Sequence, residues 1–203
     1  MYYSEGLIDK KIRESYFPDL DYKGIMVEVG AGPTVYFSMS KHFRESGWRC
    51  ILVEPNPKFV EFHKQLGHEV YHYACSNEDK ESTFTIINTP TWHKYETDGC
   101  SFSAIEVHTN QLPEKATKEV IPMKLIKLDT LLENLDIEKI DYLSIDVEGW
   151  EIEVMKGFSP EKYNPKVIVL ENVGNSSKYS SYMNSVGYKL DFTMTHNEIY
   201  TKN

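Results

Sequence analysis

Acidic and amide side chains stand directly after two apolar segments in the second half of the chain. Asp146 closes the segment DYLSIDV, and Glu171 and Asn172 close the segment KVIVLENV. Both segments have the composition of buried strands, and strands that alternate with helices along a chain form parallel sheets. In such sheets ligands bind beyond the carboxyl ends of the strands. We therefore expect Asp146, Glu171 and Asn172 to face one point, where their hard oxygen atoms suit Mg²⁺ or Mn²⁺.

The same acids also suit proton transfer without a metal. In that interpretation Asp146 or Glu148 is the general base that takes a proton from a reacting group. Glu148 has a further interpretation, because Gly149 follows it where a helix is expected to begin. A carboxylate at that place can accept hydrogen bonds from free backbone N–H groups, which is a structural role. The sequence leaves these alternatives open.

A glycine-rich turn in the first half of the chain predicts a ligand site. The stretch MVEVGAGPTVYFS is typical of a strand, a tight turn and the start of a helix, with Ala31 between Gly30 and Gly32. Glycine adopts positive φ angles and lets a ligand approach the backbone, and a helix N-terminus offers free N–H groups. A nucleotide-like cofactor is the expected ligand.

The details of the turn distinguish between two cofactors. A dinucleotide-binding turn has a third glycine, and Val35 stands at that position. Glu28, two residues before the first glycine, is placed to meet the amino acid end of S-adenosylmethionine. Glu54, at the end of CILVEP, is placed to accept hydrogen bonds from both ribose hydroxyls, and Ala74 and Cys75 leave room for the adenine ring. We therefore favour S-adenosylmethionine over NAD, and keep an NAD-binding oxidoreductase or a non-catalytic nucleoside-binding module as alternatives.

The remaining pattern predicts one α/β domain over residues 1–203. An amphipathic helical segment occupies residues 1–20, and alternating strands and helices follow, including a helix from about Val35 to Ser46 and a strand EVYHYAC. Residues 82–128 interrupt this alternation with two strand-like segments around a long loop, and long loops of this kind are often functional. We expect this loop to bind the acceptor, with His108 within reach of it as a catalytic candidate. The chain closes with an expected antiparallel hairpin.

The composition excludes several classes of partner. The 31 acidic and 22 basic residues give a net charge of -9, which disfavours nucleic acid and anionic membranes. No apolar stretch of the sequence is long enough to approach the length of a membrane span. Cys50, Cys75 and Cys100 form neither a disulfide framework nor a zinc motif, so we expect a cytoplasmic protein with reduced thiols.

Taken together, these motifs resemble the FkbM family of class I S-adenosylmethionine-dependent O-methyltransferases. The most specific match is IDYLSIDVEGWEIEVMKGF, supported by VEVGAGP, LVEP, YACSNEDKESTF, KLDTLL and GYKLDF. The first turn departs from the pattern frequent in that family, because Gly32 and Pro33 replace an asparagine and its successor, and Thr34 replaces a glycine. This departure concerns the contacts to the methionine part of the cofactor.

The resemblance implies a Rossmann-like, mostly parallel seven-stranded sheet in the order 3-2-1-4-5-7-6, with helices on both faces. It also implies methyl transfer to a hydroxyl group of a small molecule or glycan, and a deoxyhexose such as rhamnose is the expected acceptor. The small serine-containing stretch that the family has near Gly99 places Ser101 among the cofactor-binding candidates. Because such domains also occur fused to glycosyltransferases, the chain is expected as one domain of a larger protein or as a separate enzyme.

Overall fold

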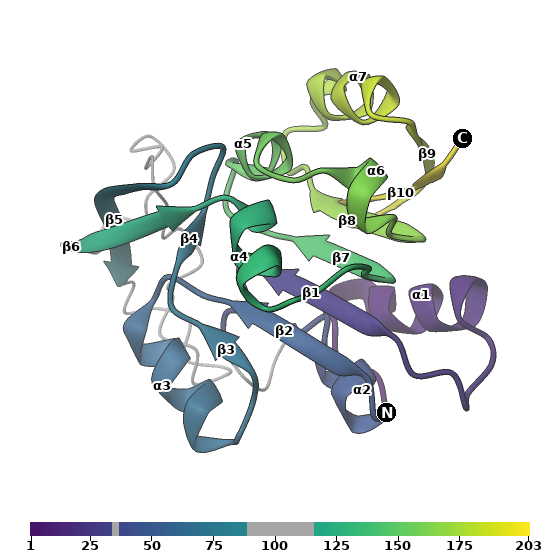
Figure 1. Ribbon diagram of the computed structural model, residues 1–203, viewed down its shortest axis with the longest axis horizontal. Coiled ribbons are helices and arrows are strands. Elements are labelled where there is room, and N and C mark those ends of the chain that lie inside the picture. Colours follow the sequence, from purple (N-terminus) through teal and green to yellow (C-terminus); the bar gives the residue numbers. More distant parts are fainter. Residues whose placement is uncertain (34–36, 89–115) are drawn as a thin grey trace.

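A computed structural model describes residues 1–33, 37–88 and 116–203, and its centre is a seven-stranded sheet (Figure 1). The order of strands in this sheet is β3-β2-β1-β7-β8-β10-β9. Counted within the sheet, this is the expected order 3-2-1-4-5-7-6, with β10 antiparallel to both of its neighbours. The strands are β1 (Ile25–Val29), β2 (Arg49–Val53), β3 (Val70–Tyr71), β7 (Tyr142–Ile145), β8 (Val167–Glu171), β9 (Tyr188–Met194) and β10 (Asn197–Lys202).

A second, three-stranded sheet has the order β4-β6-β5 and projects to one side of the main sheet (Figure 1). Its strands are β4 (Ala74–Cys75), β5 (Lys80–Asn88) and β6 (Thr117–Ile126). The expectation of a single strand EVYHYAC was therefore wrong, because a turn in which the Tyr73 N–H donates to the Tyr71 carbonyl separates β3 from β4. The long expected loop between β5 and β6 lies outside the described residues over 89–115.

Helices cover both faces of the main sheet (Figure 1). They are the short 3₁₀ helix η1 (Glu5–Leu7), followed by α1 (Ile8–Tyr16), α2 (Lys41–Glu45), α3 (Pro57–Gln65), α4 (Leu128–Asn134), α5 (Glu151–Lys156), α6 (Pro160–Tyr163) and α7 (Ser177–Ser185). Among the described residues, no helix has the length and apolar character needed to cross a membrane.

Helix α2 begins later than the sequence suggests. We expected a helix from about Val35, but the described residues become helical only at Lys41. Phe37 has a φ of 62°, and the Glu28 carboxylate accepts hydrogen bonds from the Met39 N–H and the Ser40 hydroxyl. Side-chain hydrogen bonds to the backbone compete with helix formation in this way.

The central strands alternate between two hydrophobic cores. In β1, Val27 and Val29 pack on one face with α4, α5 and α7, whereas Met26 packs on the other face with α1 and α2. The same alternation holds in β7, where Leu143 and Tyr142 point to opposite faces. Because side chains alternate across a strand, burial on both faces produces the apolar runs seen in the sequence. This rigid centre fixes the positions of the residues that follow each strand.

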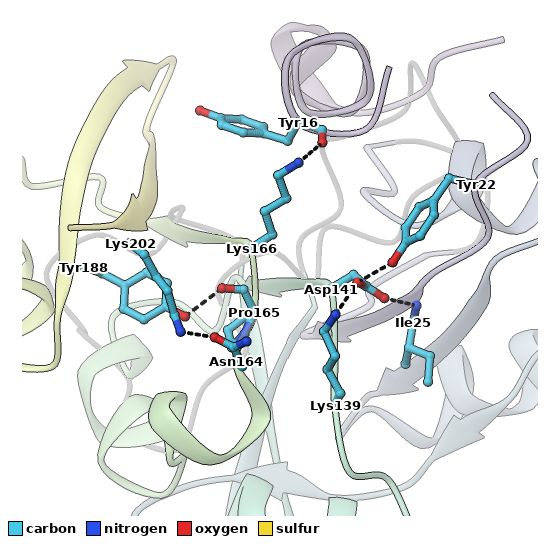
Figure 2. A network of polar contacts seen from close by, with 10 residues as sticks. All are labelled: Tyr16, Tyr22, Ile25, Lys139, Asp141, Asn164, Pro165, Lys166, Tyr188 and Lys202. Atoms are coloured by element: carbon cyan, nitrogen blue, oxygen red, sulfur yellow. Dashed lines mark hydrogen bonds and ion pairs between the residues drawn. The ribbon is translucent and has the colours of Figure 1, made fainter. Parts of the chain in front are cut away.

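A polar network connects the N-terminal segment to the amino ends of strands in the main sheet (Figure 2). The Asp141 carboxylate accepts hydrogen bonds from the Tyr22 hydroxyl at 2.7 Å and from the Ile25 N–H at 2.9 Å. The Lys166 ammonium donates to the Tyr16 carbonyl at 2.6 Å. The pocket lies at the opposite, carboxyl ends of the strands.

Candidate functional site

A pocket of about 530 Å³ opens at the carboxyl ends of β1, β2, β7 and β8. This volume is within the range of small-molecule sites. Its lining contains most of the residues that the sequence singled out, namely Glu28, Gly30, Ala31, Gly32, Glu54, Ala74, Cys75, Asp146, Glu148 and Glu171. Parallel strands from distant parts of the chain therefore bring these residues to one place.

The glycine turn needs its two glycines for different reasons. Gly30 and Gly32 have φ angles of 81° and 57°, which residues with a side chain rarely adopt. A Cβ on Gly30 would lie 1.8 Å from the Asp146 carbonyl oxygen, so this glycine lets the β1 turn pass against the β7 turn. Around a Cβ on Gly32, in contrast, no atom of the described residues lies within 4 Å. The backbone at Gly32 is thus open to a ligand.

Glu54 lies at the end of β2 and holds the glycine turn. Its carboxylate accepts hydrogen bonds from the Gly32 N–H at 2.8 Å and from the Asn56 N–H at 2.7 Å. Burial raises the pKa of Glu54 to about 7, although these two hydrogen bonds oppose the rise. Each carboxylate oxygen has a second lone pair, so the group retains acceptor capacity toward a ligand in the pocket.

Glu28 also borders the pocket, and the protein itself already uses both of its oxygens. One accepts the Met39 N–H at 2.8 Å and the other accepts the Ser40 hydroxyl. Burial raises the pKa of this carboxyl group. Glu28 therefore shapes the chain that follows the glycine turn, and its contact with the amino acid end of a cofactor stays a prediction.

Three carboxylates, Asp146, Glu148 and Glu171, form the acidic cluster of the pocket. One oxygen of each lies within 4.8 Å of the others. Enclosure by the protein and the neighbouring Glu171 raise the pKa of Asp146, even though its side chain faces the open space of the pocket. Burial and Asp146 raise the pKa of Glu148 to about 8. Like charges this close cannot all be ionised without a counter-charge, so the cluster suits a cation or an exchangeable proton.

The loop that carries Glu148 is held by a residue that we did not single out from the sequence. The fully buried Glu151 accepts hydrogen bonds from the Val147 N–H at 3.0 Å and from the Gly149 N–H at 3.1 Å. Its other oxygen accepts the Tyr179 hydroxyl at 2.6 Å. Glu151 thus holds the loop in front of α5, and in the described structure no side chain, Glu148 included, caps the start of this helix. An acid in the first turn of a helix is the signal that could have identified Glu151.

Asn172 is not brought to the cluster. Its amide group donates to the Glu198 carboxylate at 3.0 Å and to the Ser176 carbonyl at 3.1 Å, and its oxygen accepts the Ser176 N–H at 2.9 Å. Asn172 therefore joins β8 to β10 and to the start of α7. The sequence predicted Asn172 as the third side chain of the cluster. In the described structure that third side chain is Glu148.

The wall next to β4 consists of small and aromatic side chains. Ala74 and Cys75 line the pocket together with Phe84 and Trp150, and the Trp150 indole donates to the Ser76 hydroxyl at 3.1 Å. Burial raises the pKa of the Cys75 thiol to about 12, so this thiol stays neutral and packs as an apolar group.

The N-terminal segment, the terminal hairpin and Phe37 also line the pocket. Glu5 and Ile8 come from the N-terminal segment, and His196 and Asn197 come from the hairpin. The N-terminal segment thus borders the pocket as well as the body of the protein. His108 and Ser101, which the sequence placed in the acceptor loop, lie outside the described residues.

Comparison with models of protein families gives a match. Residues 28–190 match a family model described as the methyltransferase FkbM domain. This range begins within β1 and ends within β9, and it contains the glycine turn, Glu54, the acidic cluster and the whole three-stranded sheet. A search of the curated proteins finds no match.

Proposed function

Because the chain belongs to the FkbM methyltransferase family, we propose that it transfers a methyl group from S-adenosylmethionine to a hydroxyl group of a sugar. The proposed acceptor is a deoxyhexose such as rhamnose, free or within a glycan. The observation that carries the proposal is the meeting of a glycine turn, the Glu54 carboxylate and an acidic cluster in one pocket. Membership of a methyltransferase family favours the methyl donor over NAD, the alternative that the sequence left open.

The donor side of the pocket fits a nucleoside with a methionine tail. Glu54 accepts ribose hydroxyls, Ala74 and Cys75 border the adenine, and the open backbone at Gly32 receives the tail. When bound, the donor supplies an activated methyl group on a sulfonium cation. Carboxylates around the pocket favour that positive charge over the neutral product S-adenosylhomocysteine.

The acidic cluster activates the acceptor. An alcohol is a weak nucleophile at neutral pH, so its proton must be removed as the methyl group is transferred. Glu148, with a pKa of about 8, is matched to this task, and Asp146 orients the hydroxyl group in line with the methyl group. Asp146, Glu148 and Glu171 also fit a divalent cation, since all three offer hard oxygen ligands at close range. Bound Mg²⁺ or Mn²⁺ would supply Lewis acidity that lowers the pKa of the hydroxyl group.

A turnover assay tests the proposal. The purified chain is incubated with S-adenosylmethionine and with methyl rhamnoside or methyl glucoside, and S-adenosylhomocysteine release is measured with EDTA and with added Mg²⁺ or Mn²⁺. We expect release that depends on the deoxyhexose, and a metal requirement would assign the cluster to a cation. Absence of release with every sugar would contradict the proposed acceptor class.

A further inference from the structure

A histidine that has no role in the proposed mechanism contacts the glycine turn. His63 lies on α3 and is fully buried. Its Nε2 atom is 3.0 Å from the Gly32 carbonyl oxygen, and its Nδ1 atom is 2.9 Å from Nδ1 of His68. Both ring nitrogens are therefore engaged, one of them by the turn itself.

These contacts define which nitrogen of each ring carries the hydrogen. A carbonyl oxygen only accepts, so Nε2 of His63 must donate to Gly32. Burial lowers the pKa of His63 to about 4, and a neutral ring with hydrogen on Nε2 has a lone pair on Nδ1. His68 must then donate from its own Nδ1. The hydrogen bonds run in one direction, from His68 through His63 to Gly32.

The peptide groups of Gly32 are held at both ends. The Gly32 N–H donates to Glu54 at 2.8 Å, and the Gly32 carbonyl accepts from His63 at 3.0 Å. No side chain stands on this residue, and its backbone borders the pocket. Because glycine has the widest conformational freedom of all residues, we expect these two hydrogen bonds to restrain the Gly32 backbone at its φ of 57°.

We propose that His63, held in one tautomer by His68, is a positioning residue that fixes the Gly32 carbonyl and makes the donor turn sensitive to acid. The effect on donor binding rests on the proposed function. The effect on the turn itself does not, because the contacts exist without a ligand.

The charges around the histidine pair oppose its protonation. Arg44 of α2 acts on both rings, Lys41 of α2 acts on His68, and His68 acts on His63. Glu54 lies on the far side of Gly32 and titrates near pH 7. In a locally opened turn His63 returns to its ordinary pKa of about 6.5, so the open form binds more protons than the closed form. The closed turn is therefore favoured at neutral pH and loses stability as the pH falls from about 6.5 toward 4.

Two substitutions separate the hydrogen bond from simple packing. In H63Q the amide nitrogen can still donate to Gly32 and cannot be protonated, whereas H63L fills the space without a donor. Hydrogen exchange of the peptide spanning residues 28–33 is measured at pH 7.5 without ligand. We expect exchange about tenfold faster in H63L than in the native chain, and near-native exchange in H63Q. Equal exchange in all three proteins would overturn the positioning role.

Calorimetric titration with S-adenosylhomocysteine at pH 7.5 and pH 5.5 tests acid sensitivity. Titration of Glu54 is common to the native chain and H63Q, so we compare the two affinity ratios. A larger loss on acidification in the native chain supports the proposal, and equal losses contradict the acid sensitivity. If the native chain does not bind this probe while H63L still shows faster exchange, the donor assignment fails and the positioning of Gly32 stands.

Histidine nitrogen NMR of the native chain gives a test that needs no variant to fold. The expected signature at pH 7.5 is a neutral His63 with hydrogen on Nε2 and a lone pair on Nδ1. The opposite tautomer would overturn the proposal, since its Nε2 could not donate to Gly32.

Discussion

Asp141 and Asp146 stand at opposite ends of β7, and the protein surrounds them in opposite ways. At the amino end Asp141 is matched by donors, the Tyr22 hydroxyl, the Ile25 N–H and the Lys139 ammonium at 3.6 Å (Figure 2). At the carboxyl end the groups that shift the pKa of Asp146 through charge are all carboxylates. A paired carboxylate stabilises the fold, whereas a carboxylate placed against like charges costs stability and is suited to chemistry.

Single substitutions of the two aspartates by asparagine should have the largest effects. Asp146→Asn should lower the turnover rate about 10³-fold, since the carboxylate that orients the acceptor hydroxyl group is lost, and should leave S-adenosylhomocysteine affinity within a few-fold. Its free energy of unfolding should be unchanged or higher, because repulsion in the cluster falls. S-adenosylhomocysteine release and urea unfolding measure the two quantities.

Asp141→Asn is the matched control at the other end of the strand. It should keep turnover and lose about 2 kcal/mol of unfolding free energy, because the charge that three donors face is removed. Native turnover in Asp146→Asn, or lost turnover in a folded Asp141→Asn, would contradict the division of roles between the two ends of β7.

The two glycines of the turn should differ in the next largest effect. Gly30→Ala places a Cβ against the Asp146 carbonyl and should cost about 3 kcal/mol or more of unfolding free energy, since backbone must move as well as adopt a strained φ. Gly32→Ala has only the strained φ to bear and should cost about 1 kcal/mol. Thermal unfolding of both variants measures the difference, and equal losses would contradict the close passage of the two turns.

A smaller effect concerns the pH dependence of stability. The folded pKa of Glu148, about 8, exceeds its unfolded value of 4.5, so the folded chain binds more protons between these values. The stabilisation from Glu148 is complete below pH 4.5 and is lost as the pH rises toward 8. In Glu148→Gln the unfolding free energy should fall less steeply over this window, by up to about 1.4 kcal/mol per pH unit. Identical slopes in urea titrations at pH 5, 6, 7 and 8 would contradict the raised pKa that burial and the neighbouring Asp146 give Glu148.

Short apolar runs predicted the strands at the centre of the sheet. The order of the strands was predictable only through the family resemblance, which the long IDYLSIDVEGWEIEVMKGF motif carries most specifically. The start of the helix expected from Val35 was not predictable, because the Glu28 carboxylate accepts hydrogen bonds from Met39 and Ser40. Helix propensity depends on neighbouring residues alone, whereas these contacts join a strand to a later turn.

Within the site, strand ends located Asp146 and Glu171 but not the partner of the pair. Asn172 turns to Glu198 on β10, a residue that is distant in sequence, and Glu148 takes its place because Glu151 bends the loop through backbone contacts. The sequence suggested no more than a surface or packed histidine at position 63, because the contact of His63 with the glycine turn depends on how α3 packs.

The assignment of the pocket to a methyl donor is tested by calorimetric titration of the native chain with S-adenosylhomocysteine, run beside NADH under the same conditions. We expect saturable binding of S-adenosylhomocysteine with one site per chain and no binding of NADH. Binding of NADH, or no heat from either compound, would contradict the assignment of the pocket to a methyl donor.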